Sequence, residues 1–185
     1  MRGKNIWIIA LVVLGVVGLV FVEGFVNPRN EAKQNRYEAE QQNPLTHDFT
    51  ALAKYRSPYM GDNSNLSHLN QALPLRERLN GYQLYPETFA AQVNYSLDTH
   101  EMDAEELERI LVYNAVANFV MIDNLEQVVY QLENTSYTLR RKSAQQWTGT
   151  ELKELQNPEL WDLTVREKLV EPAQVKEAFS QIVDN

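Results

Sequence analysis

The stretch that decides the fold is Ile110–Ile122, which reads ILVYNAVANFVMI. Only two asparagines and the hydroxyl of Tyr113 are polar in it, so a helix formed here is apolar nearly all round. Such a helix needs a buried position, and it is too short to cross a bilayer. Asp103 is expected to begin the helix, because its spacing to Glu106 resembles a capping box. The sequence therefore predicts a central buried helix that the other elements surround.

Segments with strand patterns lie on both sides of this helix. Residues 81–85 predict a short strand, and residues 89–97 alternate between apolar and polar side chains, as a strand with one buried face does. The predicted buried face consists of Phe89, Ala91, Val93, Tyr95 and Leu97. Residues 125–133 and 137–141 predict a second hairpin around a turn at 134–136. Two hairpins and a buried helix predict the α+β class, with a small antiparallel sheet packed against the central apolar helix.

The N-terminal end of the chain is an apolar run. Residues 6–22 are apolar without interruption, and Gly24-Phe25-Val26 extend the run past Glu23. This is roughly the 20 residues that a helix needs to span a bilayer. The run lacks the small-x-small cleavage site of a signal peptide. We expect residues 1–26 to form a cytoplasmic flank and an N-terminal transmembrane helix, with a cleaved signal peptide as the alternative.

Charge and composition predict the rest of the organisation. Arg2 and Lys4 precede the apolar run, and a short basic flank usually stays in the cytoplasm. We therefore expect a single-pass protein of the cell membrane with an extracytoplasmic C-terminal domain. Residues 27–44 are polar and rich in Gln and Asn, which predicts a stalk. Residues 45–185 are expected to fold as one domain with its core at about 47–170.

Net charge limits the partners. The chain carries 25 acidic and 17 basic residues, for a net charge of −8. We expect no nucleic-acid partner, because that binding depends on neutralising phosphates with Lys and Arg. The expected partners are the lipid bilayer, through residues 6–26, and an envelope protein or peptide. The chain contains no cysteine, which excludes a lipoprotein anchor.

The sequence contains no recognisable catalytic or metal-binding motif. His47, His68 and His100 are scattered, without a His-Glu-x-x-His pair, and Gly-x-Ser-x-Gly is absent. The segment 62–65 lacks the spacing of a calcium loop. We expect surface or loop histidines, no cofactor, no bound metal and no enzymatic activity.

The densest unusual stretch is Tyr55–Ser64, which reads YRSPYMGDNS. One interpretation is a recognition loop, where tyrosines supply contact area and polar residues supply hydrogen bonds. Its candidate binding residues are Tyr55, Tyr59, Asp62, Asn63 and Ser64. The other interpretation is a structural corner. In the corner, Gly61 adopts a positive φ, Asp62 or Ser64 caps the next helix, and both tyrosines dock on the core.

Two further groups have alternative interpretations. Asn114 and Asn118 lie on one face of the central helix, where they either bind a ligand or satisfy the backbone groups of neighbouring loops. Arg140-Arg141-Lys142 is the only basic cluster. It either holds an anion, such as a phosphate of a wall polymer, or protects a sheet edge and pairs with acidic neighbours.

Several of these pieces together resemble a known family. They are Tyr-x-Ser-Pro-Tyr-x-Gly-Asp-Asn-Ser at 55–64, Leu73-Pro74, Val93-Asn94-Tyr95, Asn114-Ala115 and Ile122-Asp123-Asn124. Over roughly residues 47–145 the chain is similar to the domain of unknown function numbered 4825, a bacterial family found mainly in Gram-positive species. The resemblance implies an extracytoplasmic domain, often behind a membrane or lipoprotein anchor, that in some relatives accompanies metalloprotease-type sensors. It implies no activity and assigns no functional residue.

The leading hypothesis is a membrane-anchored extracytoplasmic binding or interaction module, with envelope sensing as its process. One alternative is a cell-envelope hydrolase or other enzyme, which needs a pocket that joins a histidine or two carboxylates. The other is a structural subunit of an envelope complex, which needs a large exposed apolar patch. The sequence does not identify the ligand, the oligomeric state or the physiological process.

Overall fold

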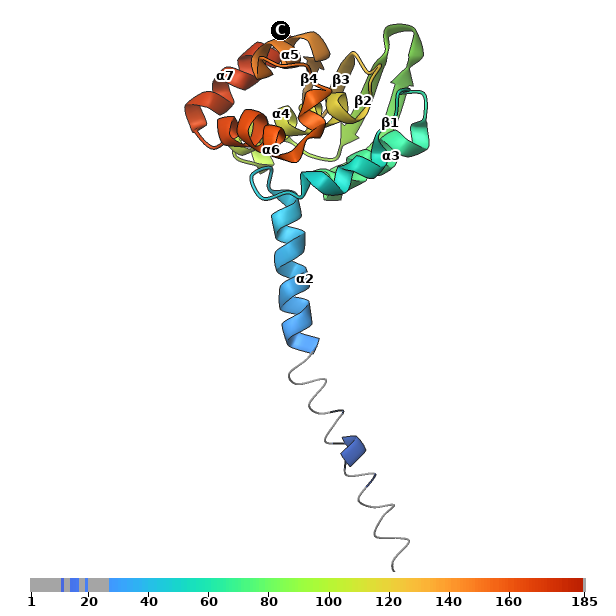
Figure 1. Ribbon diagram of the computed structural model, residues 1–185, viewed down its shortest axis with the longest axis vertical. Helices are drawn as coiled ribbons and strands as arrows, with labels where there is room; N and C mark the ends of the chain where they lie inside the picture. The colour runs from blue at the N-terminus through green and yellow to red at the C-terminus, as the bar shows by residue number, and fades with distance from the viewer. Residues whose placement is uncertain (1–10, 12–13, 17–18, 20–26, 185) are drawn as a thin grey trace, which may run out of the picture. The chain divides into compact units, whose positions relative to one another are not determined.

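The computed structural model describes residues 11, 14–16, 19 and 27–184 (Figure 1). The transmembrane helix expected at 6–26 lies largely outside these residues. Within the described part of the chain, no helix combines the length and apolarity that a membrane crossing requires. The chain divides into two compact units, Met1–Glu40 and Gln41–Asn185, which are described separately.

The first unit contains most of α2 (Asn27–Gln42), which occupies the segment predicted as a stalk. Its residues 30–39 are all exposed, so no side chain in that range is held by a core. Two pairs four residues apart connect its turns, Gln34 with Glu38 at 2.7 Å and Arg36 with Glu40 at 2.9 Å. Each such pair stabilises a helix by only a few tenths of a kcal/mol.

The second unit contains a mixed set of helices and strands. In chain order these are η2 (Phe49–Tyr55), α3 (Asn63–Ala72), η3 (Arg76–Arg78), β1 (Leu79–Tyr85), η4 (Pro86–Thr88), β2 (Ala90–Tyr95), η5 (Thr99–Glu101), α4 (Ala104–Met121), β3 (Gln127–Gln131), β4 (Ser136–Arg140), α5 (Arg141–Thr148), η6 (Glu154–Gln156), α6 (Pro158–Trp161), the π-helix η7 (Asp162–Arg166), η8 (Glu167–Leu169), α7 (Pro172–Ile182) and β5 (Val183–Asp184). The predicted α+β class is confirmed.

The sheet has the order β1-β2-β3-β4-β5, in which β5 has only two residues. Both predicted hairpins are present, since β1 pairs with β2 and β3 with β4 in antiparallel fashion. The prediction of a wholly antiparallel sheet is wrong, because β2 and β3 are parallel. The 18-residue α4 returns the chain to the starting end of β2 before β3 begins, and such a crossover is what a parallel pair requires.

The core lies between the sheet and α4, which runs through the middle of this unit (Figure 1). All residues from Ile110 to Met121 in α4 are buried, as its sequence predicted. Asp103 caps the helix by accepting from the backbone N–H groups of Glu105 and Glu106 at 3.0 and 3.1 Å. This fixes the predicted start of α4.

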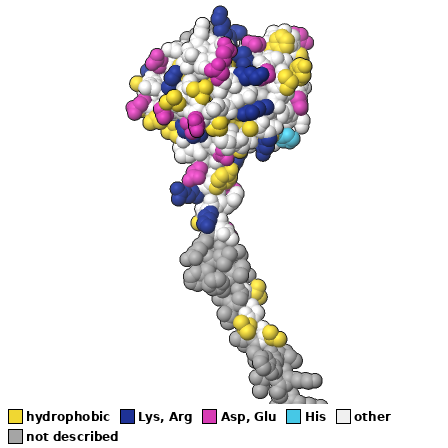
Figure 2. All heavy atoms as spheres, in the orientation of Figure 1, with side chains coloured by type: hydrophobic (Ala, Val, Ile, Leu, Met, Phe, Trp, Pro, Cys, Tyr) yellow, Lys and Arg dark blue, Asp and Glu magenta, His cyan; other side chains and the backbone are white. Residues whose placement is uncertain are grey.

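The predicted buried face of β2 is correct except at its first residue. Ala91, Val93, Tyr95 and Leu97 are buried, but Phe89 is 47% exposed. Phe89 has a φ of 50° at the end of η4, so it precedes β2 and does not follow the alternation of that strand. Acidic and basic side chains are interspersed over the face of the second unit that Figure 2 shows.

Candidate functional site

The loop Ser57–Asp62 connects η2 to α3, and its first residue is bound to the end of α4. The backbone N–H of Ser57 donates to the carbonyl of Met121 at 2.8 Å, and the N–H of Asp123 donates to the carbonyl of Ser57 at 3.0 Å. These two bonds form a parallel bridge between Ser57 and Ile122. The start of the loop is therefore fixed to a buried helix.

The far end of the loop is fixed as well. The N–H of Met60 donates to Oδ1 of Asn124 at 2.6 Å, and the Met60 side chain is buried. Asp62 is the N-cap of α3, since its Oδ1 accepts from the N–H of Asn65 at 2.9 Å. The Asn65 amide then donates to the carbonyl of Tyr55 at 2.7 Å. Hydrogen bonds thus hold the loop backbone at both ends, and the bond from Asn65 to Tyr55 joins the two residues that flank it.

These contacts confirm a corner, but two details expected of it are wrong. Tyr59 does not dock on the core: it is 69% exposed, because Met60 takes the inward position. Gly61 does not adopt a positive φ, and a Cβ at Gly61 would meet nothing within 4 Å. Among the described residues, the glycines with positive φ are Gly81 and Gly149.

The five candidate binding residues divide into two groups. Tyr59, Asp62, Asn63 and Ser64 are all exposed, at the tip of the loop and on the first turn of α3. Tyr55 is half-buried, with the Lys54 ammonium 4.9 Å from its ring centre. The geometry therefore leaves an exposed tyrosine beside three polar residues, with Tyr55 below them as a support of the corner.

The buried asparagines of α4 hold neighbouring segments together. The side-chain amides of Asn118 and Asn70 donate to each other at 3.0 and 3.1 Å. The Asn114 amide donates to the carbonyl of Pro74 at 2.9 Å. All three asparagines have no exposed surface. The interpretation that the pair satisfies backbone groups of neighbouring loops is confirmed for Asn114, whereas Asn118 bonds to the Asn70 side chain and to its own helix.

The basic cluster does not form one cationic surface, because Arg141 is turned inward. Its Nε donates to the carbonyl of Leu125 at 2.6 Å, and its Nη2 donates to the carbonyls of Phe119 and Ile122 at 2.7 and 2.5 Å. A cation at this place suits the negative end of the α4 dipole. Burial lowers the pKa of Arg141, but a guanidinium stays charged in proteins. Arg141 therefore closes the C-terminal end of α4.

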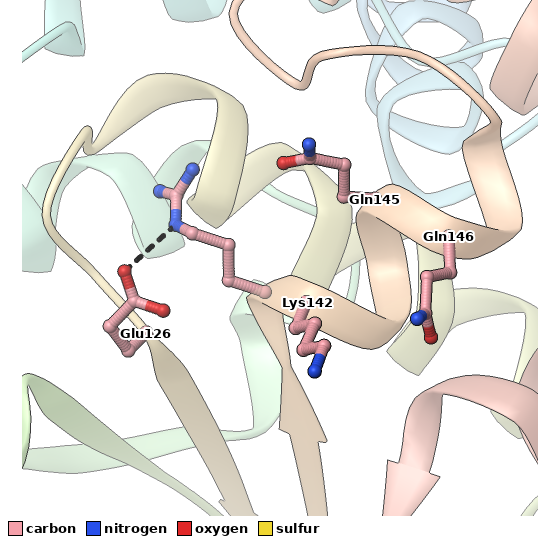
Figure 3. A pocket seen from close by; sticks show the side chains of 5 residues that line it. Glu126, Lys142, Gln145 and Gln146 are labelled. Carbon is pink, nitrogen blue, oxygen red and sulfur yellow. Dashed lines mark ion pairs between the residues drawn. The ribbon is translucent and has the colours of Figure 1, made fainter.

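A shallow hollow lies over this guanidinium, lined by Glu126, Arg141, Lys142, Gln145 and Gln146 (Figure 3). The dashed line in Figure 3 is the ion pair of Glu126 with Arg141, at 3.8 Å. Lys142 and Gln146 extend the same way from α5, while Gln145 extends the opposite way. The carboxylate in this hollow faces a cation that is already bound to carbonyls, and this arrangement provides no acid–base pair.

A second hollow of about 240 Å³ shares Arg141 and Gln145 with the first and includes Asp123, Glu151 and Lys153. Gln145 donates to Glu151 at 2.9 Å, and Lys153 is 3.9 Å from Asp123. The charges of this hollow are thus balanced internally. Since Asp123 also bonds to Ser57, the hollow adjoins the Ser57–Asp62 loop.

His47 lies in the loop between α2 and η2, one of the two expected locations, but it is buried. It is 1% exposed, and its ring lies between Tyr113 and the end of α3. Nε2 lies 2.8 Å from the carbonyl of Ala72, so Nε2 carries the proton and Nδ1 accepts from the Tyr113 hydroxyl at 2.9 Å. Burial lowers the pKa of His47. His68 and His100 are exposed as expected, and in the described part of the chain no three His, Asp or Glu residues could hold a metal ion.

A family model described as Domain of unknown function (DUF4825) matches residues 52–145. No curated protein and no solved structure matches the chain. The matched residues run from η2 into α5 and include the loop, α4 and β1 to β4.

The motif pieces within the match contact one another. Ser57 bonds to Asp123, and Met60 bonds to Asn124, so the tyrosine-containing loop and the Ile-Asp-Asn segment form one corner. Pro74 bonds to Asn114. Sequence reasoning missed the contribution of Asn124, although a polar residue directly after a buried helix is a plausible anchor for a nearby loop.

Proposed function

This chain belongs to the family Domain of unknown function (DUF4825), and we propose that its second unit works as a binding or interaction module. The observation that carries the proposal is the contrast between Tyr59 and the backbone beneath it. The side chain is 69% exposed, while Ser57, Met60 and Asp62 fix the loop through hydrogen bonds to distant or following residues. A pre-ordered loop loses little conformational entropy on binding, and tyrosine provides much contact area with few rotatable bonds.

We extend the proposal to the place where this module works. The apolar run at residues 6–26 is long enough to anchor the chain in a bilayer, and Arg2 and Lys4 before it favour a cytoplasmic N-terminus. The domain that begins near residue 45 is then extracytoplasmic. Its partner is an envelope protein or peptide, and envelope sensing is the process that this placement suggests.

Two hollows of the described residues are lined by carboxylate pairs, Glu154 with Glu159 and Glu105 with Glu108, but neither hollow includes a histidine, so the hydrolase alternative stays the weaker one. His47 is enclosed in the core, and the carboxylates of the two hollows beside Arg141 are paired with nearby cations or amides. The structural-subunit alternative relies on an apolar patch. The exposed Leu163 and Val170, at 61% and 49%, are two single side chains, one in η7 and the other in the turn after η8.

The proposal is tested with a photoreactive phenylalanine analogue placed at position 59 of the full chain in its own cells. The matched control is the same analogue at Phe89, which is also an exposed aromatic residue but lies at the β1–β2 corner. We expect one adduct of defined mass from position 59, reduced by excess unmodified chain, and no such adduct from position 89. The absence of an adduct at 59, or the same adduct at both positions, would contradict the proposal.

A further inference from the structure

The sheet buries only one of its faces against α4. Val93, Tyr130 and Leu139 point into the core from three adjacent strands. Because side chains alternate along a strand, the intervening residues point to the opposite face. That face carries five carboxamides, which we call the amide face: Gln83 on β1, Gln92 and Asn94 on β2, and Gln127 and Gln131 on β3.

The strand register brings these carboxamides next to one another. Gln83 lies opposite Gln92, and Asn94 lies opposite Gln131. All five residues are exposed or partly exposed, although the Gln131 amide already donates to the carbonyls of Leu132 and Thr135 at 2.8 and 3.3 Å. Neighbouring strands are about 4.8 Å apart, so three strands spread the amide groups over roughly 10 Å.

Part of the amide face is ordered before any ligand binds. The Tyr85 hydroxyl donates to Oε1 of Gln92 at 3.1 Å, and Nε2 of Gln92 donates to Oδ1 of Asn94 at 2.7 Å. This chain of bonds leaves Nδ2 of Asn94 as an available donor. A Cβ at Gly81 would lie 3.9 Å from that nitrogen, so the glycine leaves space beside it.

The amide face is nearly neutral although the protein is acidic. The chain carries 25 acidic residues and a net charge of −8. No carboxylate occurs at the outward positions of the described residues of β1 to β4, and the single charged residue there is Arg140 on β4. Carboxamides, and not charged side chains, occupy outward positions on each of β1, β2 and β3. Amides in their place provide hydrogen bonds without a requirement for charge.

We propose that the amide face binds a neutral glycan strand. A carboxamide both donates and accepts, which matches the hydroxyl and acetamido groups of a sugar. An acidic polymer is disfavoured by the charge of the protein, and a peptide strand would add to a sheet edge. Val129, which lies opposite Gln92 in the middle of the face, offers an apolar surface to the ring carbons of a sugar. This surface is separate from the Tyr59 loop.

The test uses the full chain in a detergent that has no sugar headgroup. Chitohexaose, which carries acetamido groups, and cellohexaose, which carries only hydroxyls, are titrated separately by calorimetry. The variants are Gln92→Ala and Gln127→Ala, and Gln174→Ala on α7 is the matched control, because it is an exposed glutamine outside the sheet. Thermal unfolding of each variant checks that it is folded. The Gln127 side chain forms no hydrogen bond with the described residues, so Gln127→Ala is expected to stay folded and keeps the test decisive if Gln92→Ala unfolds.

We expect at least one hexasaccharide to bind. Each face variant should weaken binding about two- to tenfold, the usual effect of one lost hydrogen bond, while the control binds like the wild type. Binding to a neutral ligand should change little when salt is raised. The proposal is overturned if neither sugar binds, if both face variants bind like the wild type, or if salt abolishes binding. A failed crosslink at Tyr59 would leave this result unaffected.

Discussion

Asn70 of α3 and Asn118 of α4 join their side-chain amides in two reciprocal hydrogen bonds, of 3.0 and 3.1 Å, in the centre of the core. Neither residue has exposed surface. The remaining capacity of each amide is used locally, because Asn70 also donates to the carbonyl of Leu66 and Asn118 to that of Asn114. The pair therefore fixes the position of α3 on α4 through a polar contact. Water does not reach either amide to take the place of its partner.

Asn118→Ala should destabilise the protein by about 1–3 kcal/mol. The change leaves the amide of Asn70 without its partner in a place that water does not reach, and an unpaired buried polar group has a cost of this size. The double variant Asn70→Leu with Asn118→Leu should cost less than the sum of Asn70→Leu alone and Asn118→Leu alone, since neither amide is then left unpaired. Urea unfolding measures both values. Strict additivity would contradict the coupling.

Tyr59→Ala should change the free energy of unfolding by no more than about 0.5 kcal/mol, because the side chain is exposed. Gly61→Val should also cost little, since Gly61 does not have a positive φ and its surroundings are open. Met60→Ala is the contrasting variant, and it should cost about 2–5 kcal/mol because the side chain is buried. Thermal and urea unfolding compare the three. A large effect at 59 with a small one at 60 would reverse the assignment of the inward residue.

Arg141→Ala should cost at least about 1.5–3 kcal/mol, the value of a hydrogen bond to a charged group, since several carbonyls lose their donor together. Lys142→Ala is the matched control, because this neighbouring cation is exposed and should stay within about 0.5 kcal/mol. Urea unfolding at two salt concentrations measures both. Equal effects of the two changes would contradict the closing of α4 by Arg141.

Stability should fall as the pH drops below 6.5, the ordinary pKa of histidine. Burial is the main cause that lowers the pKa of His47 in the folded protein, so the unfolded chain takes up a proton there first. The contribution of His47 is thus complete above 6.5 and is lost as the pH falls toward its folded pKa. His47→Gln should flatten the dependence of unfolding free energy on pH below 6.5. His68→Gln, at an exposed position, is the matched control.

The helical core could be predicted because burial decides it. Ile110–Ile122 is too apolar to be stable on a surface. The direction of β3 could not be read in the same way. Alternation shows which face of a strand is buried and says nothing about direction, which depends on the connection. The length of α4 was the available signal for a parallel crossover.

The sequence predicted that residues 55–64 form a corner, but it did not predict which residue of the corner points into the core. Which of Tyr59 and Met60 faces the core depends on the bond of the Met60 N–H to Asn124, a residue 64 positions away. Arg141 shows the same limit. In the sequence it is one member of a basic cluster. Its acceptors are backbone carbonyls, and every residue has one, so the sequence does not show which carbonyls it binds. Hydrogen bonds between a side chain and a distant backbone group explain both errors.

The proposed topology can be measured with single cysteines, because the chain contains none. Gln174→Cys places a thiol at an exposed position on α7, and Gly3→Cys places one before the apolar run. A membrane-impermeant maleimide added to intact cells should label the first variant and not the second, which should react only after the membrane is opened. This expectation follows from the basic flank at Arg2 and Lys4. Labelling of Gly3→Cys alone in intact cells would reverse the orientation. A shortened protein that lacks the thiol of Gly3→Cys would show that the N-terminal segment is a cleaved signal peptide.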